Sequence, residues 1–381
     1  MVKIQKNPFS FGPVVKEGDY CPRDKEERVI EELLVSGEKV AIVGERRMGK
    51  TSLALHILEV KLSRPYVHVD FMGVRDEREA ASRILNAIST SRHEFFKFET
   101  ILKTLGHLKP SVTIGNDGNP SLSFNVKQNE IDESIDSAFK LLKDFCKKEV
   151  IVFFDEFQDL LKIEDSNRLF GILRGKIQNL NRIPFLFAGS YRSQMDRIFK
   201  DPENPFYNGA TVIEVTTIDK KIFYNFTLKK MKGKDIKLSE DTFSKIYDMV
   251  YGVLGDVQRF FRTAYLLLEK KSELDDVTCK NILHEIFKYE QTTFQEIMTG
   301  SILTTLQRDI LRELSVENTN PYSKGFMTKL ETTSASGVTR GLNALESKNF
   351  IYRYRDEYRF YNPFFKEWIK SQHHIHLNSL F

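Results

Sequence analysis

The chain has 381 residues, enough for two or three domains with a sizeable core. Hydrophobic residues make up 41% and charged residues 29%, which are ordinary values for a globular protein. The net charge of +4 permits a nucleic-acid partner without identifying one. No run of about 18 apolar residues occurs and the first residues lack an apolar signal core, so we expect a cytoplasmic protein with no membrane contact.

The first predicted elements surround a glycine-containing loop. A helix is predicted over about residues 24–36, residues 40–43 suit a buried parallel strand, and the residues after Thr51 have the apolar pattern of another helix. The loop between strand and helix fits the phosphate-binding pattern G-x-x-x-x-G-K-[ST] at every fixed position. Because this context agrees with the motif, a chance glycine-rich turn is the less favoured interpretation.

The residue types of this loop suit a triphosphate. Gly44 and Gly49 let the backbone curl so that successive N–H groups can surround phosphate oxygens. Lys50 is expected to reach the β- and γ-phosphates, and the Thr51 hydroxyl to ligate Mg²⁺. Residues 20–26, just before this unit, either pack near the nucleotide base or only start a helix. The predicted nucleotide-binding residues are Gly44, Glu45, Arg46, Arg47, Met48, Gly49, Lys50, Thr51 and Ser52.

The alternation of strand and helix is interrupted once. A strand is predicted at residues 66–71 and a single helix over about residues 77–104. Residues 108–126 then alternate apolar and polar side chains on both sides of a turn, which predicts an inserted β-hairpin. We expect this hairpin to project from the sheet as a contact surface, and a disordered polar loop is the alternative.

A second motif follows the predicted helix at residues 131–147. Residues 150–154 form a continuous apolar strand that ends in Asp155 and Glu156. Asp155 is expected to hold Mg²⁺ and its water shell, and Glu156 to orient and polarise the attacking water. Two acids after a strand are often only a solvated loop, but the phosphate-binding loop makes that interpretation less favoured.

Two further strands complete the predicted sheet. After a helix near residues 166–180, residues 184–190 form a buried strand ending in Ser190, and residues 212–215 form the last strand. In nucleoside triphosphatases with an additional strand beside this acidic motif, a small polar residue at that position senses the γ-phosphate or its water. Ser190 is the candidate here, and the alternative is that it only starts a turn.

From about residue 216 to residue 300 the strands stop and amphipathic helices are predicted, for example over residues 242–251 and 257–271. A small helical bundle behind a nucleotide-binding sheet can act as a lid that closes on ligand. Arg259, at the start of one helix, either reaches the phosphates or is a solvated surface charge, and we favour the second interpretation.

Residues 301–371 have the pattern of a winged helix-turn-helix. Helices are expected near residues 304–314, 322–330 and 335–348, then two strands within residues 350–361 and a closing helix at residues 363–371. The outward positions of the third helix are expected to meet DNA, as are arginines of the wing. With 11 Lys and Arg against 8 Asp and Glu in residues 301–381, double-stranded DNA and a protein partner both stay open. The candidate DNA-contacting residues are Thr339, Arg340, Asn343, Arg353 and Arg355, with Arg359 also in the wing.

Several of these segments together resemble the archaeal-type ATPases, which are AAA+-like, signal-transduction-type P-loop ATPases. The resemblance covers nearly the whole chain and implies ATP and Mg²⁺ as ligands, hydrolysis and switching between nucleotide states. It implies catalytic roles for Lys50, Thr51, Asp155 and Glu156, and a contribution of Arg46 or Arg47 to γ-phosphate stabilisation or to a subunit contact. The segments that carry it are Asn7-Pro8-Phe9, the loop with its paired arginines, Phe154-Asp155-Glu156-Phe157-Gln158, Ala188-Gly189-Ser190 and the winged helix.

The lid departs from that family. Its turn reads Gly252-Val253-Leu254-Gly255-Asp256 where the family has a Gly-His-Pro-like turn. It is similar to the Gly-Asp turn of origin-recognition-type AAA+ proteins, which also end in a winged helix and bind DNA. The resemblance therefore leaves the phosphate sensor of the lid undefined.

The sequence predicts an α/β fold: an AAA+-like P-loop NTPase with a parallel sheet flanked by helices, a helical lid and a C-terminal winged helix. We expect an ATPase domain at residues 1–216 with the hairpin at about 108–126, a lid at 217–300 and a winged helix at 301–381. The predicted function is an ATPase switch that engages DNA, a protein partner or a second copy. An origin-recognition-like DNA-binding protein and a non-hydrolysing, ATP-bound scaffold are the alternatives.

Two other enzyme classes are disfavoured. A GTPase would carry an Asn-Lys-x-Asp motif that reads the guanine base, and the chain has none. A small-molecule kinase of the P-loop class has no need of the large appended domains, and Glu156 behind Asp155 suits activation of water better.

Overall fold

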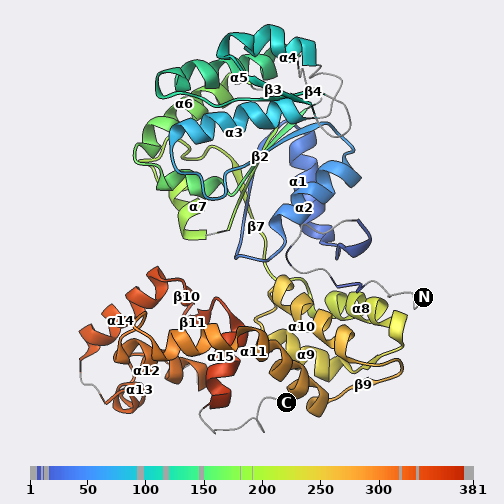
Figure 1. The fold of residues 1–381 in the computed structure, drawn as a ribbon, viewed down its shortest axis with the longest axis vertical. Coiled ribbons are helices and arrows are strands. Elements are labelled where there is room, and N and C mark those ends of the chain that lie inside the picture. The colour runs from blue at the N-terminus through green and yellow to red at the C-terminus, as the bar shows by residue number, and fades with distance from the viewer. Residues whose placement is uncertain are drawn as a thin grey trace. The chain divides into compact units, whose positions relative to one another are not determined.

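The protein divides into two compact units in a computed structural model (Figure 1). One unit is Val14–Thr217, and the other combines Met1–Pro13 with Ile218–Phe381. None of the described helices has the length and apolar character needed to cross a membrane. The residues that the structure describes are 7–9, 12, 17–91, 98–114, 120–145, 150–180, 182–190, 192–316, 320–331 and 334–372.

The first unit is built on a five-stranded, fully parallel sheet in the order β2-β5-β6-β1-β7. Every residue of β5 and β6 is buried, as the continuous apolar runs of these strands predict. Strand β6 lies between β1 and β5, so the predicted additional strand beside the acidic motif is confirmed. The strands are β1 (Lys39–Val43), β2 (Tyr66–Asp70), β5 (Ile151–Asp155), β6 (Phe185–Gly189) and β7 (Thr211–Glu214).

Helices flank this sheet. Helix α2 continues into a π-helical turn, Ile57–Lys61, against which α1 packs, while α5 packs against α3, α4 and α6. Phe157–Lys162 forms a short 3-10 helix directly after the acidic motif. The α-helices are α1 (Asp24–Val35), α2 (Lys50–His56), α3 (Glu77–Thr90), α4 (Phe98–Leu105), α5 (Ile131–Phe145), α6 (Ser166–Gln178) and α7 (Arg192–Phe199).

The single helix predicted over residues 77–104 is wrong. Helix α3 ends at Thr90, Ser91 has an extended backbone with φ −64° and ψ 118°, and α4 begins at Phe98. The hydroxyls of Thr90 and Ser91 donate to backbone carbonyls of the last turn, at 2.8 and 2.7 Å. Such side-chain bonds compete with helix propagation, whereas the apolar period alone continues through residue 105.

The inserted hairpin is present; Ser111, Val112 and Thr113 of its first strand are exposed, while its second strand packs on α3. Strands β3 (Ser111–Ile114) and β4 (Pro120–Ser123) pair antiparallel. The Asn86 side chain of α3 exchanges two hydrogen bonds with the Phe124 backbone, at 3.3 and 2.7 Å, and the Ser89 hydroxyl donates to the Leu122 carbonyl at 3.0 Å. Leu122, Phe124 and Val126 are buried, so this side of the hairpin belongs to the core.

The second unit is mostly helical. A short parallel pair, β8 (Lys237–Leu238) with β9 (Glu273–Leu274), lies within the stretch where no strand was predicted. The winged helix has the expected three helices, antiparallel β10–β11 pair and closing helix. The remaining elements are α8 (Lys220–Met231), α9 (Glu240–Met249), α10 (Leu254–Leu267), α11 (Asp276–Thr299), α12 (Thr305–Val316), α13 (Lys324–Lys329), α14 (Ala335–Ser347), β10 (Ile351–Tyr354), β11 (Glu357–Phe360) and α15 (Pro363–Gln372).

The described N-terminal residues pack on this helical unit. The Phe9 ring lies 5.8 Å from Phe261 and 6.2 Å from Tyr265, and the Asn7 side chain donates to the Arg262 carbonyl at 3.0 Å. The carbonyl of Pro8 accepts from the Lys230 ammonium. Residues 7–9 therefore belong to the second unit, although the sequence boundary at residue 216 placed them in the ATPase domain.

A cluster of phenylalanines fills the core beneath the acidic motif. Phe157 is fully buried, and its ring centroid lies 4.8–6.2 Å from those of six other phenylalanines. These six are Phe71, Phe154, Phe170, Phe187, Phe199 and Phe206.

Replacing Phe157 with alanine is expected to lower the free energy of unfolding by about 3–5 kcal/mol, because the cavity forms among buried rings. Tyr289→Ala is the matched control, since Tyr289 is 81% exposed and its loss is expected to cost under about 0.5 kcal/mol. Chemical denaturation followed by fluorescence measures both. A loss at Phe157 no larger than that of the control would contradict this packing.

Candidate functional site

The loop between β1 and α2 has the backbone needed to surround an anion. Gly49 is left-handed, with φ 81° and ψ 25°, and Arg47 also has a positive φ of 62°. A Cβ at Gly44 would lie 2.4 Å from the Val215 carbonyl oxygen, so only glycine fits there. Left-handed residues in a tight loop turn backbone N–H groups toward one concavity, which favours a phosphate.

The two motifs meet at the carboxyl end of the sheet. The Thr51 hydroxyl on α2 donates to Asp155 Oδ2 at the end of β5 at 2.7 Å. Asp155 is 5% exposed, and the Thr51 and Asp155 oxygens are the donor type that Mg²⁺ prefers. The glycine cradle and this oxygen pair therefore fit a magnesium-bound triphosphate.

The Lys50 ammonium lies against the loop that precedes it. It is 5% exposed, and its ammonium donates to the Glu45 carbonyl within the loop at 2.7 Å. Burial lowers the pKa of Lys50 to about 8, and the Glu156 and Asp155 carboxylates oppose that shift. A buried cation with a lowered pKa gains most from an added anionic ligand.

Glu156 and Ser190 are brought together by the structure. The Ser190 hydroxyl donates to Glu156 Oε1 at 2.7 Å, and the Gln158 side-chain amide donates to Glu156 Oε2 at 2.6 Å. Glu156 has a left-handed backbone, φ 49° and ψ 40°, which is uncommon for a residue with a side chain and occurs often at functional sites. In the sequence Gln158 stands out only as part of a motif, and nothing local identifies its contacts.

Arg23 is a second residue whose role the sequence does not reveal. It is 5% exposed, and its guanidinium donates to the Met48 carbonyl at 3.0 Å and to the Thr216 carbonyl at 2.7 Å. It therefore supports the phosphate loop from behind and links it to the residues after β7. An arginine before a helix carries no sequence signal for this role, because both acceptors are backbone groups distant in the chain.

The rest of the segment at residues 20–26 packs on the helix of the loop. The Tyr20 ring stacks on His56 at 4.0 Å, and its hydroxyl donates to Glu27 at 2.9 Å. Burial raises the pKa of Glu27, but donors on Arg23, Tyr20 and Lys61 outweigh it and leave that pKa lowered. A role beside the nucleotide base remains a prediction.

Arg46 and Arg47 are exposed at the tip of the loop, while Met48 beneath them is buried. The contribution of either arginine to a γ-phosphate or to a neighbouring subunit stays a prediction, as does the catalytic role of every other residue of the site.

The winged-helix candidates lie on α14 and on the β10–β11 hairpin. Arg340 and Asn343 of α14 are exposed, as are Arg353 of β10 and Arg355 of the turn that follows it. The Arg353 side chain donates to the Arg355 carbonyl at 3.3 Å. Thr339 is only partly exposed, and its hydroxyl donates to the Ala335 carbonyl at 3.0 Å.

Two other arginines lie at contacts between the winged helix and the helices that precede it. Arg359 of the wing lies 3.8 Å from the Tyr354 ring centroid and 5.0 Å from that of Tyr251, and its contact with a phosphate stays a prediction. Arg259 of the lid forms an ion pair with Glu290 at 3.1 Å and lies 4.8 Å from the Phe364 ring. The favoured interpretation of Arg259 as a solvated charge is therefore wrong.

Several solved structures share this fold. The Walker-type ATPase PABY2304 of Pyrococcus abyssi has 18% identity and a TM-score of 0.63, with 95% of this chain and 99% of that chain covered. The Aeropyrum pernix ORC2 protein, solved in ADPNP–ADP complexes, has 14% identity and a TM-score of 0.50, covering 91% and 92%. The Aeropyrum pernix ORC1 protein, solved in complex with DNA, has 13% identity and a TM-score of 0.50, covering 94% of both chains.

Sequence comparison defines the family. No curated protein is significantly similar to this chain in sequence. The pattern of a probable winged helix domain matches residues 292–371, and the pattern of an ATPase domain predominantly from Archaea matches residues 20–260. The chain therefore belongs to the ATPase family found predominantly in Archaea, and it carries a C-terminal winged helix domain.

Proposed function

We propose that this protein binds ATP with Mg²⁺ and hydrolyses it as a switch that controls engagement of double-stranded DNA by the winged helix. The observation that carries this proposal is the 2.7 Å hydrogen bond between Thr51 and Asp155, which assembles the two nucleotide motifs. Lys50 is buried, and the Glu156 and Asp155 carboxylates oppose the lowering of its pKa by burial.

Each residue of the site has a distinct task in this proposal. The backbone of residues 44–52 and the Lys50 ammonium hold the phosphates, and Arg47 adds positive charge at the exposed tip. Thr51 and Asp155 would hold Mg²⁺, which neutralises charge on the phosphate oxygens when bound. Glu156 orients and polarises the attacking water, and Ser190 stabilises the γ-phosphate or that water.

The second unit supplies a route from nucleotide to partner. The Arg359–Tyr251 and Arg259–Phe364 contacts attach the lid to the winged helix at two places, each within 5.0 Å of a ring centroid. Cation–π contacts of this kind contribute roughly 0.5–2 kcal/mol each. A lid that moves with nucleotide state therefore carries the winged helix with it.

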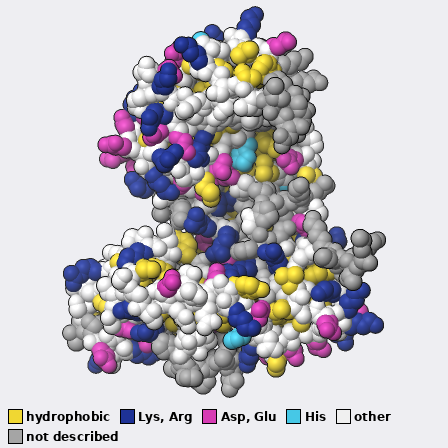
Figure 2. Space-filling view, in the orientation of Figure 1, with side chains coloured by type: hydrophobic (Ala, Val, Ile, Leu, Met, Phe, Trp, Pro, Cys, Tyr) yellow, Lys and Arg dark blue, Asp and Glu magenta, His cyan; other side chains and the backbone are white. Residues whose placement is uncertain are grey.

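The choice of DNA rests on four exposed side chains, Arg340, Asn343, Arg353 and Arg355, and on the likeness to the ORC1 protein that was solved in complex with DNA. Arginine and asparagine side chains read base edges and contact phosphates in winged-helix complexes. A protein partner is the second candidate, because basic side chains are interspersed with acidic ones over the face shown in Figure 2.

Glu156→Gln is expected to bind ATP within about threefold of wild type while turnover falls at least about 100-fold, because a neutral amide cannot accept a proton from water. Glu164→Gln, an exposed neighbour, is the control and is expected to leave turnover unchanged. Phosphate release by the purified protein, with and without double-stranded DNA, measures both. Absence of turnover in wild type would instead favour an ATP-bound scaffold.

ATP binding at about pH 8 is expected to take up protons. About half of Lys50 is neutral there in the free protein, since its pKa is lowered to about 8, and bound phosphates raise that pKa. ATP affinity is therefore full below about pH 8 and falls as the pH rises above it. Calorimetry in two buffers of different ionisation enthalpy measures the uptake. A control at about pH 6.5 is expected to show no uptake from Lys50, and equal uptake at both values would contradict the assignment.

Arg340→Ala, Arg353→Ala and Arg355→Ala are each expected to weaken DNA binding and to reduce the slope of log affinity against log salt by about 1 if the side chain contacts a phosphate. Lys270→Ala, at an exposed lysine after α10, is the control. Fluorescence anisotropy across a salt series measures the slopes. If the slope of log affinity against log salt is the same for all four variants, DNA contact by these arginines is contradicted and a protein partner of the winged helix is favoured.

A further inference from the structure

We infer that Gln158 is a positioning residue for the catalytic carboxylate, and that it links Glu156 and Ser190 to the loop between β2 and α3. The role in hydrolysis rests on the proposed function, because it assumes that Glu156 activates water. The link to the loop stands on contacts within Val14–Thr217 and can be tested without turnover.

Gln158 lies at the centre of a closed set of hydrogen bonds. It is 1% exposed, and its Nε2 donates to Glu156 Oε2 at 2.6 Å and to Asp159 Oδ1 at 3.2 Å. Its Oε1 accepts from the Ser190 backbone N–H at 3.2 Å. The Ser190 hydroxyl donates to Glu156 Oε1 at 2.7 Å and closes the ring. Both carboxylate oxygens of Glu156 are thus oriented by protein donors.

Only an amide satisfies these partners. The two carboxylates require a donor and the Ser190 N–H requires an acceptor, so the orientation of the Gln158 amide is fixed. A glutamate at this position would accept from Ser190 but would place a third negative charge against Glu156 and Asp159. A methionine would fill the volume and provide neither bond.

The space around the amide is also specific. A Cβ at Gly189 would lie 2.6 Å from Gln158 Oε1 and 2.2 Å from Met195 Sδ. Any larger residue at 189 would therefore displace the amide from Ser190. The last residue of β6 is a glycine at the point where the Gln158 side chain passes.

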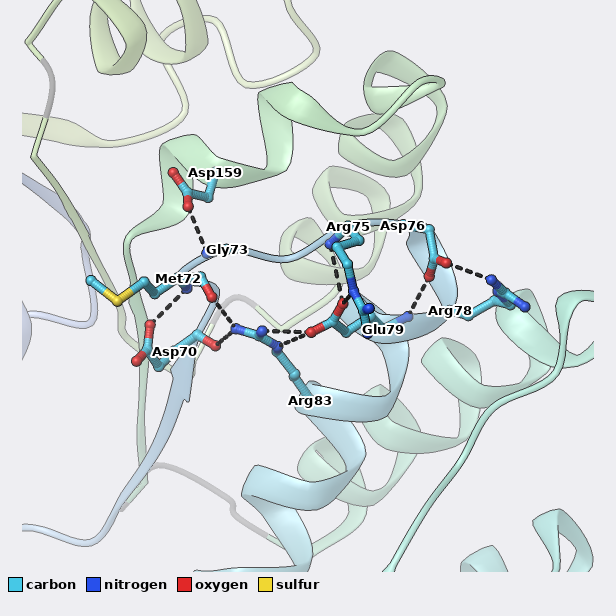
Figure 3. A network of polar contacts seen from close by, with 9 residues as sticks. All are labelled: Asp70, Met72, Gly73, Arg75, Asp76, Arg78, Glu79, Arg83 and Asp159. Atoms are coloured by element: carbon cyan, nitrogen blue, oxygen red, sulfur yellow. Dashed lines mark hydrogen bonds and ion pairs between the residues drawn. The ribbon is translucent and has the colours of Figure 1, made fainter. Parts of the chain in front are cut away.

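The set of hydrogen bonds extends to the loop after β2. Asp159, which is 5% exposed, accepts from Lys162 at 2.8 Å through Oδ1 and from the Gly73 backbone N–H at 2.7 Å through Oδ2. Figure 3 shows this contact at one side of the loop. Gly73 has a φ of 66°, so the loop conformation depends on this glycine.

Arg83 fixes the same loop from the other side. Its guanidinium donates to the Asp70 and Met72 carbonyls at 2.8 and 2.9 Å, and Glu79 holds the guanidinium at 2.6 Å (Figure 3). Met72 between these contacts is 55% exposed. A displacement of Glu156 on binding of a γ-phosphate therefore passes through Gln158 and Asp159 to a loop that is held at both sides.

The first test is single-turnover hydrolysis by Gln158→Met. We expect the hydrolysis rate to fall about 10–100-fold because the carboxylate loses its orientation, while ATP affinity stays within about threefold. Gln178→Met, at an exposed glutamine of α6, is the control and is expected to hydrolyse like wild type. Hydrolysis by Gln158→Met at the wild-type rate, while Glu156→Gln is inactive, would overturn the positioning role and leave the proposed function intact.

The second test is hydrogen exchange of the segment at residues 71–76. A non-hydrolysable ATP analogue with Mg²⁺ is expected to change its exchange rate at least about threefold relative to ADP, and Gln158→Met is expected to abolish this difference while still binding the analogue. If wild type binds the analogue without hydrolysing ATP, the proposed function fails. The exchange experiment still tests whether Gln158 links Glu156 to the loop after β2. An unchanged difference in Gln158→Met would overturn it.

Asp159→Asn keeps the experiment decisive if Gln158→Met does not fold. An asparagine has one acceptor oxygen and one NH₂ group. If its oxygen accepts from the Gly73 N–H, its NH₂ group faces the NH₂ group of Gln158, and neither of these can accept. The same loss of the nucleotide-dependent exchange difference is expected. A retained difference in Asp159→Asn would show that the loop responds by another route and would overturn the inference.

Discussion

The hydrogen bond from Thr51 to Asp155 is the constraint on which the nucleotide site depends. The two residues are 104 positions apart: Thr51 lies on α2, directly after β1, and Asp155 ends β5. These two strands are not neighbours, because β6 lies between them. The register of β6 with its two neighbours explains how Thr51 and Asp155 meet. Gly189 of β6 pairs with Val43 of β1, and Phe187 of β6 pairs with Phe154 of β5. All three strands therefore end near one level. Gly44, Asp155 and Ser190, which lie at the ends of these strands, gather at a single edge of the sheet.

The phenylalanine core fixes that edge from below. Asp155 and Phe157 are both buried, and Glu156 between them takes a left-handed backbone. Such a conformation costs about 1 kcal/mol or more for a residue with a Cβ, so it persists only where its neighbours determine it. Here the Asp155 bond to Thr51 on one side and the ring contacts of Phe157 on the other supply that determination.

Features that depend on neighbouring residues could be predicted from the sequence. The phosphate-binding loop, the acidic strand end and the winged helix all have fixed local spacing, and the structure places each on the expected element. Features that depend on distant backbone groups could not. Arg23 bonds two remote carbonyls, and Gln158 bonds the Ser190 N–H from 32 positions away. The hairpin was predicted, but its packing on α3 was not, because Asn86 carries no sign of its partner.

The wing shows the same limit in its charges. Three arginines with similar sequence neighbours lie within seven residues. Arg353 and Arg355 are exposed, whereas Arg359 lies close to two tyrosine rings. Strand alternation does not separate Arg355 from Arg359, since one belongs to the turn and the other to β11. The position of Tyr251 determines that Arg359 packs on a ring and is less exposed than the other two arginines. Tyr251 lies in a turn, with a positive φ of 56°.

Two hydrogen bonds of Arg23 connect the loop between β1 and α2 to the segment of chain that leads into the second unit. Arg23 joins the Met48 carbonyl of the loop to the Thr216 carbonyl, and Thr216 lies two residues before Ile218, where the helical unit begins. The Ile218 carbonyl in turn accepts from the Tyr247 hydroxyl of α9. One buried guanidinium therefore links the backbone at Met48 to the residues that connect the two units. This route needs no contact between the faces of the units, because the peptide chain itself supplies the connection.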